Sequence, residues 1–124
     1  MKVITKQNVK IDWTICAVCD DEQRNNPESV IAYYTVGYSK YGNGEIVVVG
    51  KVKNHKKIKN LINVFGTMLA SGEEFASGCM HCIDNANGRV DSSFSVVYGK
   101  YDNGEKWIQL LPDFELDTYK NLKF

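Results

Sequence analysis

The stretch that decides the fold is Val30-Ile31-Ala32-Tyr33-Tyr34-Thr35-Val36-Gly37-Tyr38. Its β-branched and aromatic residues occupy both faces of the pleat, and the run stops at a glycine. This composition is typical of a strand that is covered on both sides in the middle of a sheet. The sequence therefore predicts a central strand here, with the core built around it.

Two further strands are predicted on either side of this stretch. Residues 13–19 alternate as a strand, with Thr14, Cys16 and Val18 on one face. The polar segment 20–28 reads as a loop that returns the chain to the central strand, so the two strands become antiparallel neighbours. The turn-rich segment 38–44 then leads to a short apolar strand over residues 45–50.

Residues 54–71 change to a helical period, with apolar residues at Ile58, Leu61, Ile62, Phe65, Met68 and Leu69. We expect Asn54 as the N-cap and Gly72 as the C′ residue. Residues 73–91 read as a loop with at most one short strand. The apolar spacing after Ser93 fits either a second short helix or a strand. A turn at 102–104 and a strand over 107–111 follow.

Together these elements predict a single α+β domain over residues 1–124. It has a mainly antiparallel sheet of four or five strands, with the long helix on one face. Such a sheet leaves its edges open, so a homodimer through strand or helix contact is expected.

Charge and composition exclude several classes of protein. Lysine and arginine balance aspartate and glutamate, so the net charge is 0 and gives no signal for nucleic acid. The start of the chain lacks the apolar core of a signal peptide, and no run approaches the roughly 20 apolar residues of a membrane span. We therefore expect a cytoplasmic protein with no membrane contact.

Four short motifs, taken in order, resemble one family. Ala32-Tyr33-Tyr34-Thr35-Val36-Gly37-Tyr38 is similar to its Phe-Ala-Tyr-Thr-Val-Gly-Leu signature, and the segments 45–50 and 69–75 match its next strand and the end of its helix. Trp107-Ile108-Gln109-Leu110-Leu111-Pro112-Asp113 is similar to the family's C-terminal segment. The family is the small bacterial and phage-associated domain-of-unknown-function family numbered 4262, and the resemblance covers residues 13–113.

The resemblance implies an α+β fold and carries no established activity. Members commonly have His-Pro-Glu before the second strand, where this chain has Asn43-Gly44-Glu45. Only Glu45 carries over from that motif. The phage association of some members implies one specific role, which is interference with a bacterial defence signal.

The four cysteines form two C-x-x-C pairs, Cys16 with Cys19 and Cys79 with Cys82. Four thiolates can hold a tetrahedral zinc ion, so these are candidate structural metal ligands. Against zinc, strand alternation sends Cys16 and Cys19 to opposite faces, and a buried cysteine also serves as a small hydrophobic residue.

Charged and aromatic residues supply candidate ligand contacts. Lysines surround the start of the long helix, where they oppose the helix dipole, and Lys56 and Lys57 are candidates to hold an anion there. The alternative is a solvated face. Tyr34 and Tyr38, with Glu45, mark an edge of the central strand as a candidate pocket. The two arginines, Arg24 and Arg89, are predicted in loops and can clamp a phosphate.

We therefore expect a non-enzymatic protein that binds, and sequesters, an anionic nucleotide-like small molecule. The alternative is an interaction module that docks an acidic partner protein. A third hypothesis is a small thiol-dependent or hydrolytic enzyme. It has the least support, because the sequence lacks a nucleophile elbow, a phosphate loop and a His-x-x-x-His pair.

Overall fold

The computed structural model describes residues 10–82 and 93–121, which form an α+β domain. Their strands are β1 (Thr14–Val18), β2 (Val30–Val36), β3 (Glu45–Lys51), β4 (His81–Cys82), β5 (Ser93–Lys100) and β6 (Lys106–Pro112). The helices are α1 (Asp21–Arg24), α2 (His55–Ala70) and α3 (Leu116–Asn121). Short 3-10 turns are η1 (Ser39–Tyr41), η2 (Val52–Asn54) and η3 (Asp113–Glu115).

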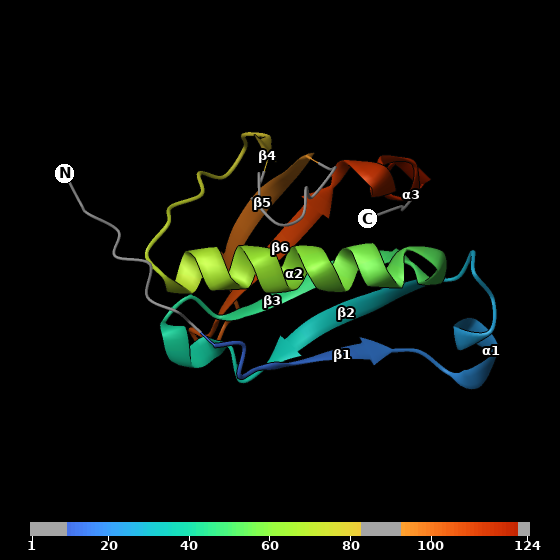
Figure 1. Ribbon diagram of the computed structural model, residues 1–124, viewed down its shortest axis with the longest axis horizontal. Coiled ribbons are helices and arrows are strands. Elements are labelled where there is room, and N and C mark those ends of the chain that lie inside the picture. Colours follow the sequence, from blue (N-terminus) through green and yellow to red (C-terminus); the bar gives the residue numbers. More distant parts are fainter. Residues whose placement is uncertain (1–9, 83–92, 122–124) are drawn as a thin grey trace.

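The sheet has six strands in the order β1-β2-β3-β6-β5-β4 (Figure 1). The predicted antiparallel pairing of the first two strands is confirmed. The predicted sheet of four or five mainly antiparallel strands matches it only roughly, because it has six strands and is mixed. β3 and β6 pair in parallel through Glu45–Trp107, Ile46–Ile108 and Val47–Gln109. The parallel pair arises because α2 carries the chain back along the sheet before β5 and β6 form their hairpin.

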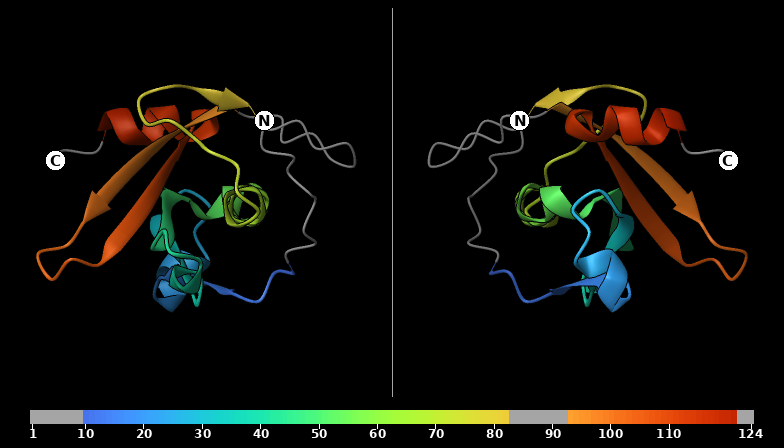
Figure 2. Two further views of the ribbon diagram at one scale, coloured as in Figure 1. Left: turned by 90° about the vertical axis from the view of Figure 1, so that its left-hand side faces the viewer. Right: turned by 90° about the vertical axis from the view of Figure 1, so that its right-hand side faces the viewer.

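The core lies between α2 and one face of the sheet, as predicted. The sheet curls around α2, with β1 on one side of the helix and the β5–β6 hairpin on the other (Figure 2). Ile58, Leu61, Ile62 and Phe65 are fully buried on α2. They meet sheet residues of the same face, which include Tyr33, Ile46, Val48, Phe94, Val96, Ile108 and Leu110.

The central strand differs from the prediction in being covered on one face only. Ile31, Tyr33 and Thr35 of β2 are buried towards α2. The residues between them face the other way and are half-buried, and Val36 is 50% exposed. A strand of β-branched and aromatic residues therefore does not require two covering layers, because a small sheet can leave one apolar face partly open.

The long helix begins and ends within one residue of the prediction, but only its C-terminal signal behaves as expected. Gly72 has a φ of 104° and is the C′ residue. Its N–H donates to Leu69 O, and the N–H of Glu73 donates to Met68 O, which is a Schellman motif. Asn54 does not cap the helix through its side chain. The η2 turn runs directly into α2 instead, which releases the Asn54 amide for another contact.

In three segments the secondary structure was left undecided by the sequence or was not predicted. The stretch after Ser93 is the strand β5, so the helical alternative is wrong. The predicted loop over residues 20–28 contains α1, whose start is a capping box between Asp20 and Gln23. A short strand, β4, lies within the predicted 73–91 loop. No helix within the described ranges has the length and apolar character needed to cross a bilayer.

Candidate functional site

A cleft lies on the sheet face opposite α2. It has a volume of about 750 Å³ and lies where β3 and β6 begin. We call it the hairpin cleft, because the turn between β5 and β6 forms one wall and η1 with the following glycines forms the other. Its lining side chains include Tyr34, Glu45, Tyr101, Glu105, Lys106 and Trp107.

Two glycines bring the walls of the hairpin cleft together. Gly44 has a φ of 85°, and a Cβ there would lie 2.2 Å from the carbonyl oxygen of Lys106. Gly99 lies beneath the indole of Trp107, where a Cβ would be 2.0 Å from Cζ2. Gly44 thus lets the start of β3 approach β6 closely. Gly99 leaves room for the indole, so the ring of Trp107 lies flat against the sheet.

Several polar groups of the cleft are uncommitted. Among the described residues, no hydrogen bond or ion pair engages the Lys106 ammonium, the Glu105 carboxylate or the Tyr34 hydroxyl. Tyr101 lies near Trp107, with ring centroids 6.5 Å apart, and is 57% exposed. The cleft therefore offers aromatic surface, one cation, one free carboxylate and a free hydroxyl at a single place, which is the composition of a small-molecule site.

Glu45 lines the cleft, but its carboxylate already has three internal donors. Oε1 accepts from the Thr35 hydroxyl at 2.8 Å and from the Tyr38 N–H at 2.9 Å, and Oε2 accepts from the Ser39 N–H at 2.8 Å. Burial raises the pKa of this carboxyl, but the hydrogen bonds from Thr35, Ser39 and Tyr38 outweigh it, so the net pKa is lowered. Glu45 thus fixes the turn that forms one wall.

Tyr38 does not reach the cleft. It is fully buried on the opposite side, where its hydroxyl donates to the Gly66 carbonyl of α2 at 2.6 Å. Burial raises its pKa far above the ordinary value for tyrosine. The ring packs edge-on against Trp13. Of the three residues predicted at this strand edge, the structure therefore brings Tyr34 and Glu45 into the cleft and places Tyr38 in the core.

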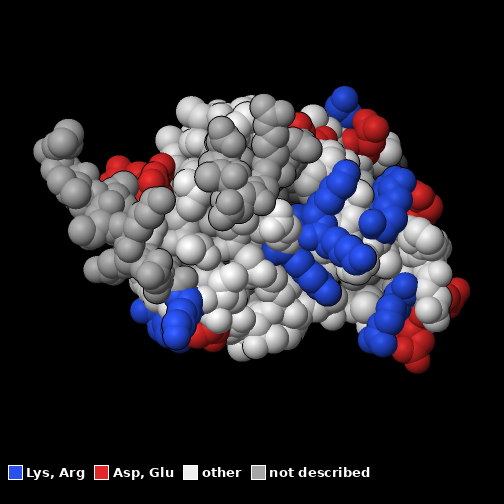
Figure 3. Space-filling model, viewed as in Figure 1, with Lys and Arg blue, Asp and Glu red and all other residues white. Residues whose placement is uncertain are grey.

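Lys56 and Lys57 lie at the far end of β3 from the cleft, in the first turn of α2. Lysines gather on this part of the surface, with acidic residues beside them (Figure 3). Glu28 pairs with Lys51 at 3.0 Å and with Lys53 at 3.1 Å, so two of the lysines near the start of α2 have an acidic partner. Lys57 lies over the ring of Phe114. The basic cluster and the aromatic cleft are therefore separate surfaces.

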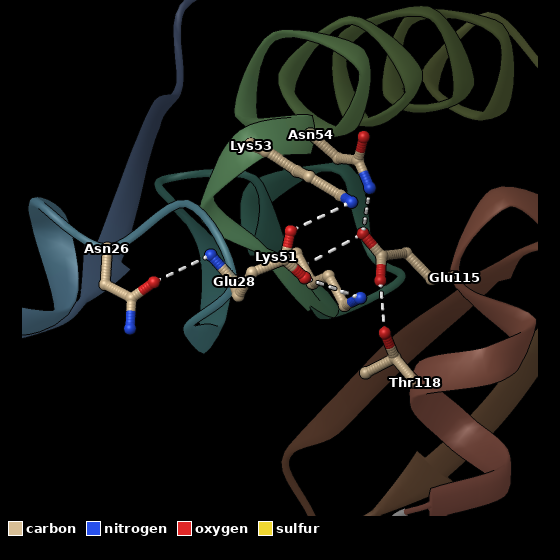
Figure 4. Close-up of polar contacts among 7 residues, drawn as sticks. All are labelled: Asn26, Glu28, Lys51, Lys53, Asn54, Glu115 and Thr118. Carbon is tan, nitrogen blue, oxygen red and sulfur yellow. Dashed lines mark hydrogen bonds and ion pairs between the residues drawn. The ribbon is translucent and has the colours of Figure 1, made fainter.

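A buried carboxylate of the chain itself lies at the start of α2 (Figure 4). Glu115 is 1% exposed, and its Oε1 accepts from the Asn54 side chain at 2.6 Å and from the Lys51 N–H at 3.0 Å. Its Oε2 accepts from the Thr118 hydroxyl at 2.7 Å. The lysines at this helix start oppose the helix dipole, which suggested an external anion. The carboxylate of Glu115 partly compensates for them inside the fold.

The remaining predicted residues do not join either surface. Arg24 is the last residue of α1, not a loop residue, and lies 4.0 Å from Asp21. Arg89 lies outside the described residues. Cys16 and Cys19 belong to β1 and its end, whereas Cys79 and Cys82 lie at β4, on the opposite edge of the sheet. Among the described residues, no group of three or more potential metal ligands comes together.

Sequence reasoning missed Lys106, and it did not single out Trp107 and Tyr101 among the many aromatic residues of the chain as the rings that share one site. The local signal was present, because Asp102-Asn103-Gly104 marks a hairpin with aromatic residues on both sides. What the local pattern lacked was the parallel pairing of β3 and β6, which brings this hairpin beside Tyr34 and Glu45.

Comparison of the chain with protein-family models, with curated proteins and with solved structures finds no match. The family resemblance in the sequence therefore stays a prediction, and the geometry of the site is what indicates a function.

Proposed function

We propose that this protein binds an anionic, nucleotide-like small molecule in the hairpin cleft and holds it without chemical conversion. The observation that carries the proposal is the meeting of Trp107, Tyr34 and Lys106 in one cleft of about 750 Å³. A cleft of this size and composition suits a small ligand with one flat ring and one charged group.

The ring of such a ligand would stack on Trp107. The indole is backed by Gly99, which leaves the other ring face for a partner and keeps the platform in place before the ligand arrives. A preorganised ring costs little conformational entropy on binding. Stacking between a base and an aromatic side chain contributes on the order of 1–3 kcal/mol.

The anionic group of the ligand would contact Lys106. This ammonium has no acidic partner among the described residues, whereas the carboxylate of Glu45 is occupied by internal donors. The proposal that the ligand is a signalling nucleotide of a bacterial defence system, sequestered by a phage protein, is supported by the family resemblance alone.

The test is a thermal-shift and fluorescence titration with nucleoside monophosphates, cyclic nucleotides and dinucleotides. A binding ligand present at 100 times its dissociation constant stabilises the fold by about 2.7 kcal/mol and raises Tm by several degrees. In a Trp13→Phe background, stacking on Trp107 also quenches the remaining tryptophan emission.

Matched charge reversals locate the site. Lys106→Glu is expected to weaken binding about tenfold or more, which corresponds to one charge-assisted contact. Lys56→Glu reverses a similarly exposed lysine at the other end of the molecule and is expected to leave binding unchanged. If no nucleotide shifts Tm, or if only Lys56→Glu weakens binding, the cleft is not the site.

A second candidate function is docking of an acidic partner protein at the start of α2. It is favoured by the exposed lysines Lys56 and Lys59 of α2, which have no acidic partner among the described residues. Basic side chains gather on one part of the surface in Figure 3. Under this alternative, an acidic polypeptide such as polyglutamate binds in a salt-sensitive manner, and Lys56→Glu rather than Lys106→Glu abolishes the binding.

A further inference from the structure

Among the described residues, the strand β1 is an edge strand with no neighbour on its outer side. Among the described residues it pairs only with β2, and Figure 1 shows it at the border of the sheet. Edge strands are normally guarded by lysine, proline, a bulge or a very short length, because their free backbone groups can pair with another chain. β1 has five residues, Thr-Ile-Cys-Ala-Val, with no charge and no proline.

The side chains of β1 add apolar surface to this edge. Val18 is 61% exposed and lies on the open face of the sheet, together with the half-buried Cys16. The cross-strand neighbour of Cys16 is Tyr34, so the exposed strip continues into the apolar open face. An added strand would therefore gain both backbone hydrogen bonds and side-chain contacts.

The charges at the two ends of β1 favour an antiparallel copy of the same strand. The C-terminal end is acidic, with Asp20, Asp21 and Glu22 against the single Arg24. The N-terminal end carries Lys10 and Lys40, of which Lys40 pairs with Asp12. When two copies of β1 run antiparallel, the acidic end of each one meets the more basic end of the other.

A second copy also closes the assembly. In the part of the chain that the structure describes, the opposite edge of the sheet is β4, which has two residues, so it offers β1 few backbone groups for edge-to-edge pairing. Pairing of β1 with β1 uses the same surface on both chains and leaves no free β1 edge. The result is a dimer and not a growing filament.

We propose that this chain forms a two-fold dimer through antiparallel pairing of β1 with β1, centred on Cys16. In this register Thr14 of one copy lies opposite Val18 of the other, and the two Cys16 residues face each other. The two sheets become one continuous sheet. The dimer contact is made by β1, whereas the walls of the hairpin cleft come from η1, the glycines after it and the β5–β6 turn; Tyr34, which lines the cleft, lies beside Cys16 in the sheet.

The register makes the proposal testable with two matched double variants. Thr14→Lys/Val18→Lys places like charges opposite each other at both ends of the pair, whereas Thr14→Glu/Val18→Lys places opposite charges there. Both residues are exposed, so both variants are expected to fold, which circular dichroism checks. The association is measured by sedimentation velocity up to about 1 mM, beyond the dissociation constants of weak dimers.

We expect the Lys/Lys variant to raise the dissociation constant of the dimer at least tenfold over wild type, and the Glu/Lys variant to restore it. A cross-link gives a second measurement. With Cys19, Cys79 and Cys82 changed to serine, diamide oxidises the two facing Cys16 thiols to one disulfide and is itself reduced to the hydrazine. A monomeric wild type at every concentration, equal behaviour of the two double variants, or no Cys16 cross-link would each overturn the proposal.

Discussion

Glu115 joins three parts of the fold, so its removal is expected to weaken the fold at one junction. The carboxylate accepts hydrogen bonds from the end of β3, from Asn54 before α2 and from Thr118 in α3. Glu115→Ala leaves the Lys51 N–H and the Thr118 hydroxyl without this acceptor, at about 2 kcal/mol each, while the half-buried Asn54 can turn to water. We expect a total loss of about 4 kcal/mol in the free energy of unfolding.

The conservative variant separates the hydrogen bonds from the bulk of the side chain. In Glu115→Gln the amide oxygen can still accept from Lys51 and Asn54, and the amide nitrogen can donate to the Thr118 hydroxyl oxygen. Only the charge is lost, so the expected cost is about 1 kcal/mol. Urea unfolding followed by circular dichroism measures both variants, with an unchanged slope expected for each. A loss below about 1.5 kcal/mol for alanine, or equal losses for the two variants, would refute the reasoning.

Three further predictions concern the walls of the cleft and the core beside it. Because the pKa of Glu45 is lowered in the folded state, its carboxylate contributes to the free energy of unfolding fully above the ordinary pKa of 4.5, and this contribution is lost as the pH falls through the folded-state pKa. Glu45→Gln should therefore reduce the loss of stability on acidification, measured by urea unfolding at a series of pH values. An unchanged pH dependence would contradict this. Tyr38→Phe removes the buried hydroxyl bond to Gly66 and is expected to cost about 1–2 kcal/mol in urea unfolding, so a neutral effect would show that the bond contributes nothing net. Gly99→Ala should displace the Trp107 indole at a cost of about 1–3 kcal/mol, with a shifted emission maximum; an unchanged spectrum would mean that the ring is not held there.

The elements with a clear period could be predicted from the sequence. The apolar positions of α2 repeat along one face, and Gly72 ends the helix because its positive φ closes the Schellman motif. Both signals are local. Asn54 shows the limit of such signals. It has the residue type and position of an N-cap, but its side chain instead donates a hydrogen bond to the buried carboxylate of Glu115, 61 residues later.

The candidate site was only half predictable for a related reason. Tyr34 and Glu45 lie on neighbouring strands that a turn joins, so their proximity follows from the local pattern. Trp107 and Lys106 reach them through a parallel pairing of distant segments, which periodicity does not encode. Tyr38 was misplaced because its position relative to Gly37 changes the alternation: after the positive φ of Gly37, the next side chain points into the core.

The parallel contact between β3 and β6 divides the sheet into two antiparallel blocks. One block, β1-β2-β3, is built from residues close in sequence, and the other is the β6-β5-β4 block, joined to it through only three paired residues on β3. In amide hydrogen exchange these blocks should behave as two cooperative units, each of which packs its buried face against α2. Because the hairpin cleft straddles this seam, a bound molecule would touch both units and slow the exchange of the β6 amides.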